Sequence, residues 1–431
     1  MEELPGSIVR IIVVKTDAKV TATLGCVSKQ WRCVASDDLL WSRFCSQDFA
    51  VSTAVDPLGN PCSSFKETYE KWYAAFDMYP SSIVKRAKQC WDTIKNWTSI
   101  HFPEVADTLA PGANEEQINK VEEDLGFQLP VPMRVLYRFC NGQNTLKHHF
   151  PQNEQLASLG LLGGYEFYEY KANVHLLPLQ YILQLTKHPV PYLKLPIGSE
   201  YVVVAVSSYR PKFFYLNCSD GQLYVGNGME QKQLVLRVPN LLDNMDQKDA
   251  MLLWLEEYGR MLQDGMFSVH KDDNIRSISL FPEKEPLCTK AVTDGVQVCG
   301  SAVFVPEYED FRRNEDKYMF SYSVRMRLLH QEKISQKRIL SSCQLSRRHW
   351  IIRANNNVID DVAGEGVIGK YPLLQEGGDE FVYESCSYLP TSSGSIEGYF
   401  TFVPGRLSKP DGPEFTVRVA PIPLQIPQYI F

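Results

Sequence analysis

The sequence lacks any arrangement of cysteine and histidine that would hold a structural metal. Its eleven cysteines include no Cys-x-x-Cys pair, and no histidine pair stands at the spacing of a zinc site. His148 and His149 are adjacent, so on a strand their side chains would point to opposite faces. We therefore expect no metal and no cofactor. The cysteines are expected to be reduced and buried, as in a cytoplasmic or nuclear protein.

Long apolar runs are also missing. The longest, near Ile8–Val14 and Tyr201–Val206, fall far short of the ~18–20 residues of a membrane span, so we expect no membrane partner. No basic segment precedes an apolar stretch at the N-terminus, and no signal peptide is apparent. An excess of basic residues is absent as well. The net charge of −7 argues against a nucleic-acid-binding protein, which would normally carry a basic stripe.

What is present is an ordinary globular composition, with 44% hydrophobic and 22% charged residues in a chain of 431. This length predicts two or three domains. The first fifty residues favour short helices. Asp17 can cap one whose apolar positions are Val20, Leu24, Val27 and Trp31, and Asp37 or Asp38 can cap the next. Three such helices are too small for an adequate core of their own, so a partner or the next domain should cover their apolar faces.

The middle of the chain has an α+β pattern. A helix is predicted after Pro80, with one apolar face formed by Ile83, Ala87, Trp91, Ile94 and Trp97. Asn114 and Gly126 are placed to begin and end another helix. Strands are predicted over Tyr165–Tyr170, Tyr201–Ser207, Phe213–Asn217 and Gln222–Val225, and the last two form a hairpin. A helix over Asp249–Leu262 closes this region.

The last third of the chain favours strands only. Residues Tyr318 to Leu328 alternate between apolar and mostly polar side chains, as a half-buried strand requires. Five further strand candidates follow or precede it, with turn signals between them. They are Val296–Val305, Leu345–Ala354, Glu380–Leu389, Tyr399–Val403 and Phe415–Ala420. The pattern predicts an antiparallel β-sandwich.

The N-terminal segment resembles the F-box motif. The residues that carry the resemblance are Leu4-Pro5 with Ile8, Val9 and Ile12, then Val27-Ser28-Lys29-Gln30-Trp31, then Leu39-Leu40-Trp41. Three positions depart from the usual motif: Thr16 replaces a common leucine, Ser28 a common cysteine, and Gly25 falls inside the second predicted helix, at a cost of ~1 kcal/mol relative to alanine. The resemblance implies contact with a Skp adaptor through Leu4, Pro5, Ile8, Val9, Val27, Trp31, Leu40 and Trp41. The alternative is that these residues form an internal helical core.

Two further resemblances follow along the chain. The middle region is similar to the SUKH superfamily at Ile118-x-x-Val121-Glu122, Leu125-Gly126, Leu129-Pro130, Leu136-Tyr137 and Asn141-Gly142. The last region is similar to ApaG proteins, which have a fibronectin-like β-sandwich, at 320–325, 344–352, 364–369, 381–385 and 398–400. We therefore expect an F-box over 1–48, a linker and connecting helix over 49–80, a SUKH-like α+β domain over 81–267 and an ApaG-like sandwich over 275–431.

This order of domains resembles F-box proteins of animals and plants. The resemblance implies a non-catalytic substrate receptor that joins a Skp adaptor, and through it a cullin, to an unknown protein substrate captured by one or both of the larger domains. Two alternatives remain open: a scaffold protein outside any ligase, and a nucleotide- or pyrophosphate-binding module in the last domain.

The second alternative rests on Gly364, Gly366 and Gly369, which match a dinucleotide-binding pattern in spacing. That pattern needs a helix after the glycines, and here the context predicts strands, so a glycine-rich turn is the competing interpretation. Exposed backbone amides with Arg347 and Arg348 as counter-charges could still hold an anion. His349 has no carboxylate partner nearby in the sequence and is expected to be structural. Asp360-Asp361 is expected to form a turn.

Overall fold

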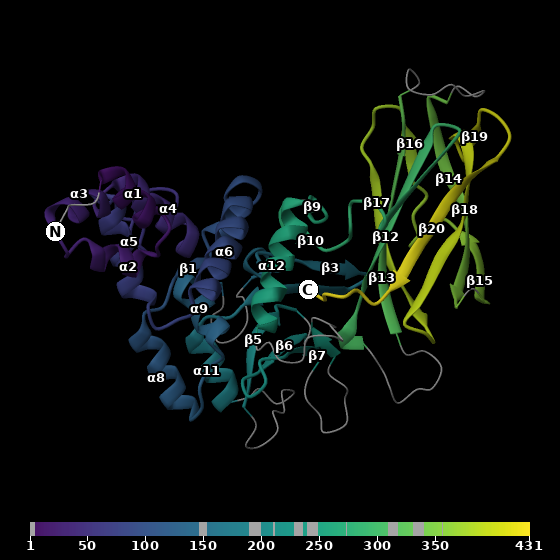
Figure 1. Ribbon diagram of the computed structural model, residues 1–431. Helices are drawn as coiled ribbons and strands as arrows, with labels where there is room; N and C mark the ends of the chain where they lie inside the picture. The colour runs from purple at the N-terminus through teal and green to yellow at the C-terminus, as the bar shows by residue number, and fades with distance from the viewer. Residues whose placement is uncertain are drawn as a thin grey trace.

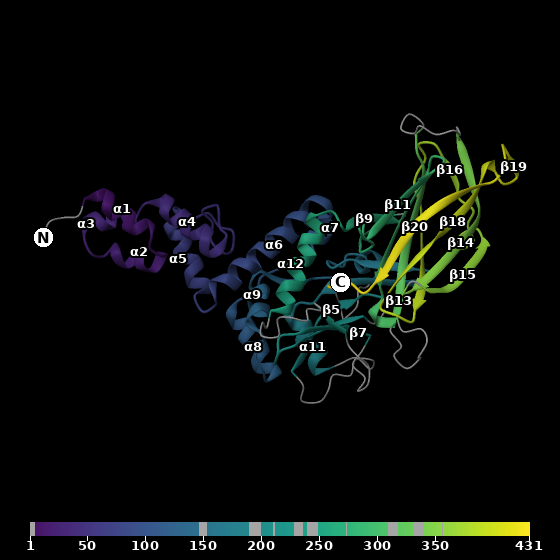
Figure 2. The ribbon, with the colours of Figure 1, turned by 45° about the vertical axis from the view of Figure 1, so that its right-hand side comes forward.

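A computed structural model describes residues 5–145, 153–188, 200–209, 212–227, 236–238, 249–272, 274–308, 318–330, 340–355 and 357–431. Its three parts follow one another along an elongated molecule. The N-terminal helices lie at one end, a mixed α/β region lies in the middle, and an all-β region lies at the other end (Figure 1). A view turned by 45° shows the same separation (Figure 2). The predicted fold class is therefore confirmed.

The N-terminal part contains four helices: α1 Gly6–Val14, α2 Ala18–Leu24, α3 Lys29–Ala35 and α4 Asp38–Phe49. Asp17 and Asp37 cap α2 and α4 as predicted, by accepting hydrogen bonds from the backbone N–H of Val20 (2.7 Å) and of Leu39 (3.1 Å). The prediction of one helix from Val20 to Trp31 was wrong. The helix ends at Leu24, and a second begins at a Ser28 cap.

The reason for this break lies at Gly25. It is the C-terminal cap of α2 and not an interior position, so the predicted penalty for a mid-helix glycine does not apply. A β-carbon there would lie only 3.3 Å from the Cβ of Ala35 in α3, so glycine allows the two helices to approach closely.

A small apolar cluster holds these helices together. It consists of Val9, Val13, Ala18, Leu40, Trp41 and Phe44. Half-buried side chains of α5, Phe65–Phe76, pack against it through Phe65 and Tyr69. The other half of α4 belongs to the large core of the molecule through Cys45 and Phe49. Helix α4 is thus the element that joins the small core to the large one.

The helices of the middle part lie before and between its strands. They are α6 Ser81–His101, α7 Pro103–Ala106, α8 Glu115–Leu125, α9 Val131–Phe139, α10 Glu154–Ala157, α11 Leu179–Lys187 and α12 Ala250–Gln263. The predicted apolar face of α6 is buried except at Ile83, which is half-buried. Asn114 caps α8 in a reciprocal pair with Gln117, and Gly126 ends that helix in the left-handed conformation, as predicted.

The middle sheet has the strand order β8-β7-β6-β5-β4-β3-β10-β9. Its strands are β3 Gly164–Phe167, β4 Tyr170–Leu176, β5 Tyr201–Ser207, β6 Phe213–Asn217, β7 Leu223–Gly226, β8 Leu236–Val238, β9 Ser268–Asp272 and β10 Ile275–Ser279; a separate pair joins β1 Leu109–Pro111 to β2 Cys140–Gln143. The predicted hairpin of β6 and β7 is confirmed. The single strand predicted over 165–170 was wrong, because the chain turns at Tyr168 (φ 50°) between β3 and β4. Strand β10 pairs with β3, so it belongs to this sheet although the sequence suggested the next domain.

Two antiparallel sheets form the C-terminal part. One has the order β11-β12-β13-β17, with bounds Cys288–Thr293, Val296–Phe304, Tyr318–Leu328 and Phe381–Leu389. The other contains β15 Asn357–Glu365, β14 Ser342–Ala354, β18 Ser393–Arg406 and β19 Lys409–Pro410, with β16 Leu373–Gln375 on β14 and β20 Phe415–Gln425 on β18. This is the predicted sandwich. The turn expected at Asp360-Asp361 was wrong, because both residues lie within β15.

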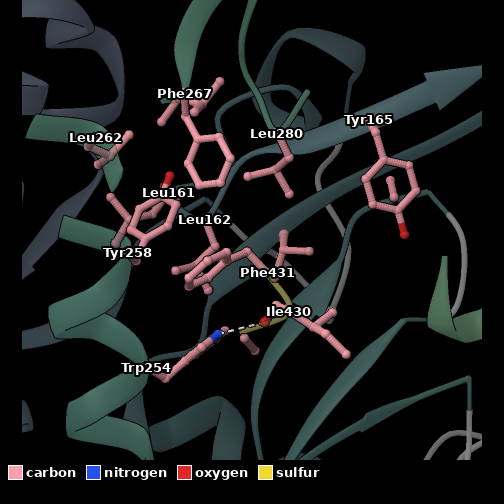
Figure 3. Packing of buried hydrophobic residues seen from close by; sticks show 14 of the residues in the cluster. Leu161, Leu162, Tyr165, Trp254, Tyr258, Leu262, Phe267, Leu280, Ile430 and Phe431 are labelled. Atoms are coloured by element: carbon pink, nitrogen blue, oxygen red, sulfur yellow. Dashed lines mark hydrogen bonds between the residues drawn. The ribbon is translucent and has the colours of Figure 1, made fainter. Parts of the chain in front are cut away.

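The two larger parts share one core. The chain leaves β20 and enters the middle part, where the Phe431 ring packs beside Trp254, Tyr258 and Phe267 (Figure 3). The Trp254 indole N–H donates to the main-chain oxygen of Ile430 (2.8 Å). Apolar residues of both parts consequently form a single buried cluster, which fixes the sandwich relative to the middle sheet.

Polar contacts also join the middle part to the sandwich. Glu307, in the short 3-10 helix η1 (Pro306–Tyr308) at the start of the sandwich, accepts hydrogen bonds from the hydroxyls of Tyr165 (2.6 Å) and Tyr170 (2.5 Å). The Lys212 ammonium donates to the Tyr165 hydroxyl (3.2 Å) and to the main-chain oxygen of Phe431 (2.5 Å). All four side chains are buried, so breaking this network would leave charged or polar groups without partners.

Candidate functional site

Exposed apolar side chains gather on the N-terminal helices. Their exposed fractions are 42% for Ile8, 58% for Ile11, 45% for Val14, 43% for Val20, 65% for Val27 and 78% for Leu39. Helix α1 exposes Ile8, Ile11 and Val14 because it is apolar on two sides. One side, with Val9 and Val13, is buried in the small core, and the other is not covered by any described part of the chain. A helix of this kind normally has a partner on its second side.

The structure divides the predicted adaptor contacts into two groups. Pro5, Ile8 and Val27 are exposed, and Trp31 is half-buried. Val9, Leu40 and Trp41 are buried, so the internal-core alternative describes their place in the structure. Leu4 lies outside the described residues.

The sequence interpretation missed Ile11, Val14, Val20 and Leu39. The all-round apolar character of α1 was the signal that could have identified the first two. Two contacts hold the exposed positions in place: Arg10 pairs with Asp37 (3.0 Å), and Arg43 donates to the main-chain oxygen of Val14 (2.6 Å). Helix α1 and the start of α4 are thus fixed relative to each other.

A second candidate site lies in the sandwich, at the opposite end of the molecule. It is a cavity of about 610 Å³ between the two sheets. Strands β14, β15 and β17 and the glycine-rich turn line it, together with Tyr168 of the middle part. The lining residues used below are Tyr168, Arg348, Trp350, Asp360, Gly369, Tyr383 and 385–388.

The glycine-rich turn shapes one wall of this cavity. Arg348 donates through Nη1 to the main-chain oxygens of Gly366 (3.0 Å) and Glu365 (3.4 Å). A β-carbon at position 364 would lie 2.9 Å from the same Nη1, so glycine leaves room for the guanidinium. Gly366 and Gly369 have φ values of 57° and 73°, which favour glycine.

Of the five residues predicted for an anion site, Arg348 and Gly369 line the cavity, and Gly364 and Gly366 support its wall. Arg347 is exposed and does not line it. Strand β16, and no helix, follows the glycines. The structure therefore has a glycine-rich turn at this place and lacks the helix that a dinucleotide-binding site would need.

Two buried polar atoms in the cavity have no hydrogen-bond partner. They are the indole nitrogen of Trp350 and the hydroxyl of Tyr383, and both residues are only 4% exposed. Burial raises the pKa of the Tyr383 hydroxyl, while the Arg348 charge and the Trp350 N–H act in the opposite direction. The Arg348 guanidinium and the Trp350 N–H therefore both lie near the Tyr383 hydroxyl. Sequence reasoning missed Trp350 and Tyr383, although alternation along β14 places Trp350 on the same face as Arg348.

His349 has a carboxylate partner, contrary to the sequence expectation. Its Nε2 lies 2.5 Å from Asp361 Oδ1, because β15 runs antiparallel to β14 and brings the two side chains onto one face. The other ring nitrogen, Nδ1, is buried and has no hydrogen-bond partner. Among the described residues, no hydroxyl or thiol is bonded to this imidazole.

Family models match the two larger parts of the chain. The SMI1/KNR4 (SUKH-1) family matches residues 112–247, and the ApaG domain matches residues 308–404. The F-box protein SKIP16 of Arabidopsis thaliana is 46% identical over 440 residues, which cover 100% of both chains. The chain belongs to this family of F-box proteins.

Other relatives are more distant. F-box only protein 3 of Homo sapiens is 26% identical to this F-box protein over 93% of this chain and 79% of its own length. Protein ApaG of Anaeromyxobacter dehalogenans is 36% identical over 32% of this chain and 94% of its own length.

The local geometry of the F-box accounts for two of its departures from the common motif. The Thr16 hydroxyl donates to the main-chain oxygen of Val13 (2.8 Å) and shares a hydrogen bond with the buried Thr21 (2.9 Å). Ser28 caps α3 by accepting from the backbone N–H of Trp31 (3.5 Å). Both polar residues thus hold helix ends in place.

Three further properties concern metals, membranes and disulfides. Within the described residues, no cluster of three or more histidine, cysteine, aspartate or glutamate side chains could hold a metal ion. None of the helices described in the structure is long and apolar enough to cross a membrane. All eleven cysteines are described, and each is a free thiol.

Proposed function

We propose that this F-box protein is the substrate-recognition subunit of a Skp–cullin–F-box ubiquitin ligase. Its N-terminal helices would bind a Skp adaptor, and through it a cullin. The observation that carries the proposal is the exposed apolar surface on α1, α2, α4 and the turn between α2 and α3, formed by Ile8, Ile11, Val14, Val20, Val27 and Leu39. We call this set the N-terminal apolar surface.

The position of the N-terminal apolar surface supports the same role. The helices that carry it lie at the free end of the molecule, away from the sandwich (Figure 1). A stable interface buries ~1,200–2,000 Å² in total, and a few well-buried apolar anchors usually dominate its energy. Leu39 and Val27 are the most exposed members of the surface, so they would gain most from being covered.

In this proposal the chain itself catalyses nothing. The F-box over 1–48 binds the adaptor, the segment 49–80 connects it to the body, and the SUKH-like and ApaG-like parts capture an unidentified protein substrate. Tethering then raises the effective concentration of the substrate near the ubiquitin-loaded enzyme. We place the complex in the cytoplasm or the nucleus, where the exposed thiols Cys26 and Cys33 would stay reduced.

The test is binding of the full-length protein to a purified Skp adaptor, measured by light-scattering chromatography and calorimetry. The wild type should form an equimolar complex at micromolar concentration. A Val27→Asp/Leu39→Asp variant should bind at least ~100-fold more weakly, because each charge would enter an apolar interface. Leu58→Asp is the matched control, since Leu58 is 88% exposed but lies in the loop before α5.

A second variant, Pro5→Ala, tests the predicted contact at the start of the motif. If the wild type formed no complex, the ligase proposal would fail, and a scaffold outside any ligase would replace it. If Leu58→Asp lost binding as strongly as the double variant, the contact surface would have been wrongly placed.

A further inference from the structure

We propose that the cavity of the sandwich binds an extended, acidic segment of the substrate protein, whose Asp or Glu carboxylate accepts hydrogen bonds from Trp350, Tyr383 and Arg348. This inference rests on the proposed function, because it names the class of substrate that the receptor captures. It also assigns the capture to both larger domains, since Tyr168 of the middle part contributes to the same cavity.

The first argument is the chemistry of the cavity floor. The Trp350 indole nitrogen can only donate, the Tyr383 hydroxyl has a proton to donate, and Arg348 is a cation. Neither of the first two makes a well-formed hydrogen bond in this structure, although the Trp350 N–H lies close to the Tyr383 hydroxyl. A buried donor without a well-placed acceptor is unfavourable. A ligand that offers acceptor oxygens would satisfy both, and a negative charge would add attraction to the guanidinium.

The second argument is the shape of the cavity. Four consecutive residues of β17, from Ser385 to Tyr388, line it. Consecutive side chains on a strand point to opposite faces, so a space that contacts all four must run along the edge of the strand. Within the described residues, β17 is paired only with β13 and is the last strand of its sheet. Its outer edge can therefore receive an added strand.

The third argument concerns the two sides of the cavity. Strand β15 is the last strand of the facing sheet, and Ile359 and Asp360 line the cavity opposite β17. Tyr168, at 68% exposure, also lines the cavity and shares a hydrogen bond with Ser385 (3.0 Å). A channel between two sheet edges suits a continuous chain, whereas a small free anion would leave most of it empty. Asp360 is exposed and repels a carboxylate at the rim, so the acid must enter on the side of Arg348.

The experiment is selection of short peptides from a random display library on the full-length protein. The best binders are then synthesised with their acidic residue, and again with the corresponding amide. Affinities are measured by fluorescence anisotropy for the wild type, Trp350→Phe and Tyr383→Phe. Tyr371→Phe is the matched control, because the Tyr371 hydroxyl contacts Glu365 outside the cavity.

The proposal expects an Asp or Glu at one fixed position of the selected peptides. The amide versions should bind about tenfold more weakly or worse, and each cavity variant should show a similar loss. Tyr371→Phe should bind as the wild type does. The melting temperature of Tyr383→Phe should not fall, because the hydroxyl that it lacks has no partner in the folded chain. A hydroxyl with a purely structural role would behave in the opposite way.

Three results would overturn the proposal: no enrichment of peptides, enrichment without a fixed acid, or equal binding to Trp350→Phe. Acetate, glutarate and phosphate are tested alone, and if they bind as tightly as the peptides, the site is one for small anions. All variants are also tested with the Skp adaptor. Because the cavity lies far from the N-terminal helices, loss of peptide binding with intact adaptor binding separates a failure here from a failure of the proposed function.

Discussion

The two ends of this F-box protein differ in how far they bury their apolar side chains. The N-terminal helices hold a small core and leave apolar side chains such as Val27 and Leu39 exposed. The middle and C-terminal parts share one continuous core, and buried polar contacts seal the interface between them. The N-terminal end thus leaves apolar surface exposed, whereas the rest of the chain buries its apolar residues in one core. In the proposed function, this arrangement would hold the adaptor and the substrate at a fixed separation.

The difference also indicates where stability resides. Removing a buried contact in the body should affect both larger domains together, because their apolar residues form one cluster. Removing a contact in the N-terminal helices should affect only those helices, unless α4 transmits the change through Cys45 and Phe49. Four substitutions, taken from the largest expected effect to the smallest, test this contrast.

The largest effect is expected for Glu307→Ala. The substitution removes the acceptor of two buried tyrosine hydroxyls and the nearby counter-charge of Lys212. Leaving a buried charge uncompensated costs about 3–5 kcal/mol. Urea unfolding should show this loss, and hydrogen exchange should show it in both larger domains. Glu104→Ala is the control, because its half-exposed carboxylate pairs with Arg276 (2.7 Å) and should contribute under about 1 kcal/mol. Equal losses in the two variants would mean that the interface network is not important for stability.

Trp41→Ala should have the next largest effect, confined to the other end. Trp41 is 2% exposed, contacts Phe44 and Tyr69 edge-on, and donates to the main-chain oxygen of Ala35 (2.7 Å). Its loss should cost about 3–4 kcal/mol, near the lower end for such substitutions, because the small core can partly collapse. Hydrogen exchange should speed up in residues 6–49 and in α5, which contacts Trp41 through Tyr69. If protection fell equally throughout the chain, the two ends would form one cooperative unit.

Local signals in the sequence predicted the N-terminal caps well. Asp17, Asp37 and Asn114 accept the expected backbone hydrogen bonds because capping depends only on residues within one turn. The prediction failed where regularly spaced apolar residues continue across the end of one helix and the start of the next. Val20 to Trp31 fit one helix by period, yet Gly25 and Ser28 divide it.

The cavity could be predicted only in part. The spacing of the three glycines stands out as a motif, and Arg348 lies in a basic pair on the strand predicted before them. Trp350 and Tyr383 come from strands in different sheets, so no local spacing joins them to each other. Tyr168 comes from another domain. Its φ is positive although it is not a glycine, so the sequence does not mark this turn. Contacts of this kind depend on long-range packing, which is visible only in three dimensions.

The pH dependence of stability gives a sharper test of the interface. Burial lowers the pKa of Lys212 from 10.5 to about 8. Between these values the unfolded chain holds a proton that the folded chain has lost, so stability rises with pH in this window and is unaffected below it. Relative to Lys212→Met, the wild type should gain roughly 3 kcal/mol between pH 8 and 10.5. The comparison cancels tyrosine and cysteine ionisation common to both proteins. If the free energy of unfolding changed with pH in the same way in both proteins, Lys212 would not be desolvated in the folded chain.

The smallest effect is expected at Asp37, where the N-terminal helices meet. Its carboxylate caps α4 at Leu39 (3.1 Å) and pairs with the largely exposed Arg10 (3.0 Å). Asp37→Ala removes both contacts and should cost about 1 kcal/mol, mostly through the lost cap. Asp37→Asn keeps a capping oxygen and removes only the ion pair, so its melting temperature should stay close to that of the wild type. If Asn were as costly as Ala, the pair with Arg10 would be the main contact holding α1 against α4. The attachment of α1 to α4 should then weaken as salt screens that pair.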